Sequence, residues 1–230
     1  MGVHDGHRDR IRDRFFANGL DAFNEIEALE FLLFYAIQRK DTNPLAHALL
    51  DRFGSLDYVL SATEEELCEV PGITKRTAAL LMMVPQLARM AEVSRASRIV
   101  EISNSRDAVQ YLIPRFRYVR DEMLILLCLD GQKRITHTEV LYRGVVNSVN
   151  FDVRKVVETA IKRKAVSVIV AHNHPDGPAR PSREDDSATQ TIFRALLNVG
   201  IKLYDHIIIA GDDYASYRQS GALELFRYGY

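Results

Sequence analysis

Two histidines and one aspartate between positions 172 and 185 have the residue types and the spacing of a metal-binding site. His172 and His174 directly follow a β-branched apolar run that is typical of a buried strand. Residues i and i+2 of an extended segment project to the same side, so both imidazoles can reach one point while Asn173 points away. A loop and a helix start are predicted next, and Asp185 falls in the first turn of that helix. Its carboxylate can therefore turn back toward the histidines.

Two neutral imidazoles and one carboxylate are three ligands suited to Zn²⁺. Three protein ligands leave a fourth position for water, which is the arrangement of a catalytic zinc site. Simpler interpretations exist: the histidines could be polar residues at a strand end, and Ser182 with Asp185 could form only a helix capping box. The letters H-N-H also occur in a nuclease motif, but that motif spreads its residues over a ββα unit. The combined spacing favours the metal site.

The same stretch resembles a known family of metal-dependent hydrolases. His172 and His174, then ten residues and Asp185, with Ser182 three positions before it, resemble the metal-binding motif of the JAB/MPN (JAMM) metallohydrolases. Within that superfamily, the stretches H-N-H-P-x-G, P-S-R-E-D and D-H-I-I-I resemble the bacterial RadC-like proteins, over roughly residues 100–230. The resemblance implies a zinc-dependent hydrolase that cleaves an amide, peptide or isopeptide bond with a metal-activated water, so a protein or peptide substrate is expected.

Two features near the motif need separate interpretations. Asp176 stands where a small serine is expected in the RadC-like family. It adds a negative charge beside the site and removes no ligand. Asp205 and His206 could orient a metal ligand from behind, but we favour the interpretation that they are a buried, hydrogen-bonded pair.

The resemblance also implies a glutamate that shuttles protons. Cleavage of an amide bond requires a group that accepts a proton from water and donates one to the leaving amine. Glu122, at the start of the apolar run M-L-I-L-L, matches the family's glutamate. Ser182 matches the family serine that stabilises the oxyanion. From the sequence alone, Glu139 and Glu158 remain alternatives to Glu122.

The elements that must position these residues change character along the chain. Residues 104–230 alternate between strand-like and helix-like patterns, and the resemblance implies a JAB/MPN-like (cytidine-deaminase-like) α/β fold with a mixed sheet flanked by helices. Residues 1–98 predict a small all-α domain, and the stretch from Arg95 to Asn104, which loses helical periodicity, is the predicted linker. The expected elements include a helix over 105–113 that Pro114 ends, strands over 122–130, 135–142 and 166–171, a helix over 183–199, and strands near 203–209 and 213–217.

Helix boundary signals recur through the first 98 residues. Asn24 is expected to cap a helix that continues to about Gln38. Asn43 before a proline predicts the N-cap of another helix. Thr63 and Glu66 predict a third helix start of the capping-box type.

Residues 67–78 resemble a helix-hairpin-helix, with two helices joined by a tight Pro-Gly turn. In that motif the free N–H groups at the second helix start and nearby cations bind a phosphate. The candidate DNA-binding residues are Gly72, Thr74, Lys75 and Arg76. The first 98 residues, however, carry 12 Lys and Arg against 15 Asp and Glu, a net charge of −3 that is unfavourable for binding duplex DNA. An ordinary helical hairpin used for packing or partner binding is the alternative.

The composition sets limits on the function classes. The 230 residues are 47% apolar, enough for a buried core, and the net charge is −1, so no overall excess of positive charge indicates nucleic acid. No apolar run approaches a membrane span, and the two cysteines do not indicate a disulfide framework. We expect a cytoplasmic protein with no membrane association. The alternative function is a DNA-associated repair or recombination accessory protein, in which the hairpin binds DNA and the metal site is structural or acts on a phosphodiester.

Overall fold

The computed structural model describes residues 6–38, 40–144 and 152–227. The chain forms two compact units, residues 1–88 and 89–230. The division falls within a long helix, earlier in the chain than the predicted linker, so the domain limits 1–98 and 104–230 stay a prediction.

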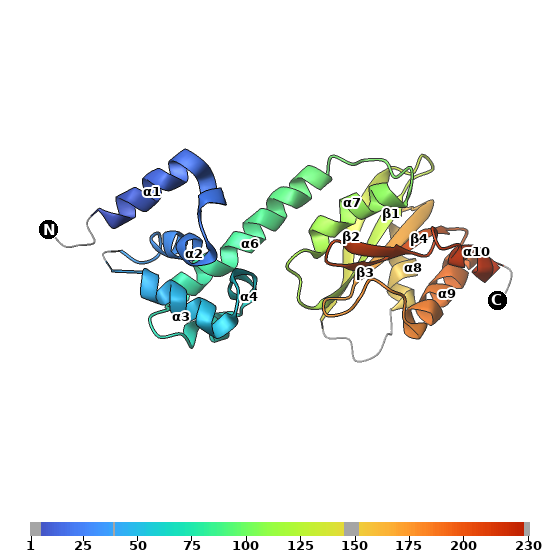
Figure 1. Ribbon diagram of the computed structural model, residues 1–230. Coiled ribbons are helices and arrows are strands. Elements are labelled where there is room, and N and C mark those ends of the chain that lie inside the picture. The colour runs from blue at the N-terminus through green and yellow to red at the C-terminus, as the bar shows by residue number, and fades with distance from the viewer. Residues whose placement is uncertain (1–5, 39, 145–151, 228–230) are drawn as a thin grey trace. The chain divides into compact units, whose positions relative to one another are not determined.

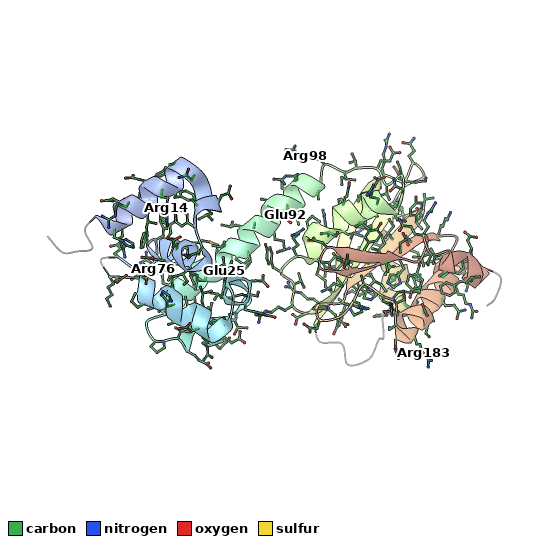
Figure 2. All side chains as sticks on the ribbon, viewed as in Figure 1. Arg14, Glu25, Arg76, Glu92, Arg98 and Arg183 are labelled. Atoms are coloured by element: carbon green, nitrogen blue, oxygen red, sulfur yellow. The ribbon has the colours of Figure 1, made fainter. Side chains whose placement is uncertain are left out.

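The first unit is helical, as the sequence predicts (Figure 1). Its buried core is formed by apolar residues of successive helices, among them Leu29, Leu49, Leu67 and Leu81. The elements are α1 (His7–Asn18), the short 3-10 helix η1 (Gly19–Ala22), α2 (Glu25–Leu33), α3 (Asn43–Phe53), α4 (Leu56–Ser61), α5 (Glu64–Cys68) and α6 (Lys75–Ala96), which continues past the division between the units.

Capping signals locate helix starts in this unit better than they locate helix ends. Asn24 and Thr63 both form capping boxes, as predicted. The predicted end of α2 near Gln38 is wrong, because α2 ends at Leu33. The next residue, Phe34, packs in a separate apolar cluster with α1, and this contact fixes the turn that follows α2. The N-cap of α3 is Thr42 and not Asn43, so the proline lies one position further into the helix.

The second unit is built on one five-stranded mixed sheet with the order β2-β1-β3-β4-β5. The strands β3 and β4 are parallel, and the other neighbours are antiparallel. The predicted mixed sheet flanked by helices is confirmed. Its elements are α7 (Ser105–Phe116), β1 (Glu122–Leu129), β2 (Ile135–Gly144), α8 (Val153–Lys162), β3 (Ser167–Asn173), α9 (Arg183–Asn198), β4 (Lys202–Ala210), β5 (Asp213–Ser216) and α10 (Ala222–Arg227).

Helices cover both faces of the sheet (Figure 1). Buried side chains of α8, α9 and α10 pack with Leu124, Leu126 and Val170 on one face. α7 packs on the other face, and it continues through Pro114 to Phe116, so the prediction that Pro114 ends this helix is wrong. Phe116 is buried, and this packing stabilises the last turn. No helix within the described ranges is long and apolar enough to cross a membrane.

Candidate metal centre

The structure brings His172, His174 and Asp185 together at the end of β3 and the start of α9. One ligand atom from each residue lies within 4.8 Å of the others. The Nε2 atoms of the two histidines are 3.0 Å apart. Nε2 of His172 is 3.1 Å from Oδ1 of Asp185, and Nε2 of His174 is 3.5 Å from Oδ2. Three potential ligand groups therefore converge on one point.

Two of the three side chains in the cluster are buried, and the third is partly exposed. The side chains of His172 and Asp185 are 5% and 4% exposed, whereas that of His174 is 19% exposed. Within the described residues, no other group of three histidine, cysteine or acidic side chains converges in this way. A Zn²⁺ ion fits this donor set of two imidazoles and one carboxylate, and solvent or a substrate would approach from the side of His174.

The end of β3 positions the two histidines. His172 lies in the sheet, opposite Leu124 of β1, and His174 follows the last residue of the strand. The His174 backbone N–H donates to the Ile209 carbonyl at 2.9 Å, which extends the pairing with β4. The side chain of Asn173 points away, as predicted: its Oδ1 accepts the backbone N–H of Met123 at 2.7 Å.

Asp185 takes part in the helix cap and in the cluster at once. Its Oδ2 accepts the Ser182 hydroxyl at 2.6 Å, and its backbone N–H donates to the Ser182 Oγ at 3.1 Å. Burial raises the pKa of Asp185, but hydrogen bonds from His172 and His174 outweigh it and hold this pKa far below the usual range. The hydrogen bond to Asp185 raises the pKa of His174. The capping box and the metal site are thus compatible, although the sequence presented them as alternatives.

Groups behind the cluster hold the ring nitrogens that face away from it. Nδ1 of His174 lies 3.1 Å from the Pro178 carbonyl, and Nδ1 of His172 lies 2.9 Å from Nε2 of His206. Nδ1 of His206 contacts the Thr189 hydroxyl, which donates to the carbonyl oxygen of Asp185. Sequence reasoning missed Thr189, although its position four residues after Asp185 places it on the same helix face. The carbonyl of Pro178 had no sequence signal.

Asp205 and His206 are both buried and hydrogen-bonded, as predicted, but their side chains face opposite sides of the sheet and have different partners. A register shift between β3 and β4 lies just before this point. Asp205 accepts the hydroxyls of Ser105 and Ser216, each at 2.7 Å. Burial raises the pKa of Asp205 and lowers that of His206. Asp205 therefore holds α7 to the sheet, while His206 contacts the metal cluster through His172.

Glu122 and its rivals lie in different surroundings. Glu122 begins β1 and is partly exposed. Glu122 lies two residues before Leu124, which pairs with His172, and the negative charge of Glu122 contributes to the raised pKa of His174. Glu139 contacts His137 and Arg163, and Glu158 pairs with Arg154, so both have partners away from the cluster.

The hairpin turn of the first unit joins α5 to α6, and one of its cations is paired. Gly72 has a φ of 96°, which a glycine adopts without strain. The Thr77 N–H is 3.4 Å from the Thr74 hydroxyl at the start of α6. Lys75 forms a 2.7 Å ion pair with Glu64, and Arg76 is exposed.

Comparisons with known proteins agree with both parts of this description. Residues 102–222 match the family model of the RadC-like JAB domain. Residues 44–84 match that of the SAM-like helix-hairpin-helix tandem, which supports the hairpin prediction. A UPF0758 protein from Fusobacterium nucleatum subsp. nucleatum is 34% identical over 225 residues, which cover 95% of this chain and 97% of that protein. The chain belongs to the RadC-like JAB-domain family.

Proposed function

We propose that this protein is a zinc-dependent hydrolase of an amide, peptide or isopeptide bond. The observation that carries the proposal is the convergence of His172, His174 and Asp185 on a point that is more open on the side of His174. The donor set suits zinc, and three protein ligands are the number found in catalytic zinc sites. A bound Zn²⁺ would lower the pKa of water toward about 7 and polarise the substrate carbonyl.

The chain's own residues supply the other functions. Glu122, which begins β1 and is partly exposed, would take a proton from the attacking water and donate one to the leaving amine. The position of Glu122 two residues before Leu124, the partner of His172, supports this role, as does the effect of its charge on the pKa of His174. The Ser182 hydroxyl bonds to Asp185 in this structure. A rotation about χ1 would release that hydroxyl to donate to the developing oxyanion.

The substitution Glu122→Gln tests the proposal. The variant should keep its zinc and its fold, because Glu122 is not a ligand. Hydrolysis by the zinc-loaded protein should fall by about 100-fold or more, the range of general acid–base groups. The measurement is cleavage of a panel of peptides and isopeptide-linked proteins, together with zinc content.

Glu158→Gln is the matched control, because Glu158 is an exposed carboxylate paired with Arg154 in the same unit. It should hydrolyse the panel at the wild-type rate. Full activity of Glu122→Gln would assign the proton transfer to another residue, and loss of its zinc would make Glu122 a ligand. A zinc-loaded wild-type protein that cleaves nothing in the panel would contradict the hydrolase proposal.

The helix-hairpin-helix match favours a second candidate function, association with DNA. We propose that Gly72, Thr74, Lys75 and Arg76 contact the phosphate backbone, in which case the protein acts as a repair or recombination accessory factor. Backbone N–H groups and one or two cations contact phosphates and not base edges, so binding would be independent of sequence. Its test is the salt dependence of DNA binding by the full chain.

A further inference from the structure

A chain of three hydrogen bonds runs behind the metal cluster and returns to it. It begins at Nδ1 of His172, which is 2.9 Å from Nε2 of His206. Nδ1 of His206 then contacts the hydroxyl of Thr189, and that hydroxyl contacts the backbone carbonyl of Asp185. His206 and Thr189 are fully buried, so water does not compete for these groups. The chain therefore links one candidate ligand to the backbone of another.

The carbonyl end of this chain determines the direction of every bond in it. A carbonyl oxygen only accepts, so the single proton of the Thr189 hydroxyl goes to Asp185. The Thr189 oxygen must then accept a proton from Nδ1 of His206. A neutral imidazole protonated on Nδ1 has its lone pair on Nε2, and that lone pair accepts the Nδ1–H of His172. When His172 is neutral, as a metal ligand must be, its lone pair consequently lies on Nε2, the nitrogen that faces Asp185.

If the hydrogen bonds of this chain ran in the opposite direction, the Nε2 atom of neutral His172 could not bind a metal in the cluster. If Nε2 of His206 donated its proton, Nδ1 of His172 would be the acceptor and its Nε2 would carry the hydrogen. His174 has the same requirement and meets it separately, because its Nδ1 faces the Pro178 carbonyl, which also only accepts. The Pro178 carbonyl therefore favours the Nδ1–H tautomer of His174, and the hydrogen-bond chain through His206 favours the same tautomer of His172.

We propose that Thr189 and His206 are positioning residues, which hold His172 in the Nδ1–H tautomer with its Nε2 lone pair directed at the metal. The inference rests on the proposed zinc site. Groups of this kind fix the orientation of a ligand and raise its basicity, and their loss typically weakens metal binding by about 10- to 100-fold.

Threonine variants on α9 provide a matched test. Thr189→Val keeps the shape and removes the hydroxyl, and it should weaken zinc binding about 10-fold or more in competition with a chromophoric chelator. Thr189→Ser restores the hydroxyl and should restore the affinity. Thr191→Val is the control, because Thr191 bonds to the Ser187 carbonyl in the same way at 2.8 Å but is exposed. It should bind zinc as the wild type does.

His206→Phe removes both ring nitrogens and keeps an aromatic ring, so it can preserve the stacking on Tyr217. It should weaken zinc binding at least as much as Thr189→Val and change the visible spectrum of the cobalt-substituted protein. The tautomer itself is read from long-range ¹H–¹⁵N spectra of the zinc-loaded wild type, in which His206 should be protonated on Nδ1.

The outcomes separate this inference from the proposed function. A wild-type protein that binds no zinc would overturn both. A wild type that binds zinc, with Thr189→Val and His206→Phe binding equally tightly, would overturn the inference alone. A neutral His206 protonated on Nε2 in the zinc-loaded protein would also overturn it, whatever the variants do. Weakened binding that Thr189→Ser fails to restore would indicate a packing defect and would remove the role of the hydroxyl.

Discussion

The cluster at the end of β3 and the hairpin turn before α6 are both candidate binding sites, but they are built in opposite ways. In the cluster, Asp185 is buried and accepts hydrogen bonds, and both imidazoles have a partner on the side facing away from the site. In the hairpin, Lys75 and Arg76 are exposed, and Lys75 is paired with Glu64. Buried polar groups cost free energy unless every one is bonded, whereas exposed charges cost little.

This difference shows how strongly the structure of each region indicates that it binds a ligand. Burying two histidines and an aspartate together costs free energy, even when neighbouring groups hydrogen-bond to each of them. Such a cluster therefore favours a role in binding a ligand. Exposed cations at a helix start also occur where nothing binds. The following predictions test this contrast, from the largest expected effect to the smallest.

The largest effect is expected from removing the two imidazoles. Wild-type protein should carry about one zinc per chain, because three protein ligands with an open position bind Zn²⁺ tightly. His172→Ala with His174→Ala should carry none by elemental analysis. His137→Ala is the control, because His137 is a partly exposed histidine bonded to Glu139 in the same unit. Full zinc in the double variant would remove the contrast between the two regions.

The second effect is a dependence of zinc affinity on pH. The hydrogen bond to Asp185 raises the pKa of His174 in the metal-free protein, so a proton competes with the metal near neutral pH. Affinity should therefore increase as the pH rises and level off above the raised pKa of His174. Asp185 contributes no proton in this range, because its pKa is far below the usual value. Calorimetry in buffers of different ionisation enthalpy should detect proton release, and an affinity that is flat from about pH 6 to 8 would contradict this coupling.

A smaller effect is expected at the hairpin. The full chain should bind DNA weakly at low salt and without sequence preference. The log–log salt slope should be shallow, at roughly −0.9 for each of one or two phosphates. Lys75→Glu with Arg76→Glu should abolish binding without loss of helicity, measured by fluorescence anisotropy and circular dichroism. Strong binding that survives both substitutions would place the DNA contact elsewhere.

The smallest effect separates the two cations of the hairpin. Glu64→Gln releases Lys75 from its ion pair, so DNA affinity at low salt should increase by about two- to fivefold. The gain should disappear at high salt, because exposed charges are screened. Glu69→Gln is the control, because Glu69 pairs with Arg52 in the same unit. A decrease in affinity on release of Lys75 would exclude it as a phosphate contact.

The sequence by itself determined the features that depend on residues close together in the chain. The spacing of His172 and His174 on an extended segment predicted a shared side, and it also predicted that Asn173 would point away. Capping boxes at Asn24 and Thr63 located two helix starts. The family resemblance added the mixed sheet and the hairpin. These features are local because side-chain periodicity and capping act within one helix turn or one strand.

The tertiary structure alone decided the features that depend on residues far apart in the chain. Burial of Phe116 allowed α7 to continue through Pro114, and a register shift between β3 and β4 decided which face of the sheet Asp205 takes and which face His206 takes. The contact of His206 with His172 joins β4 to β3 across 34 residues, and the pairing of neighbouring strands sets it. No pattern within either segment encodes that register, because the face to which a strand residue points changes with a shift of one position.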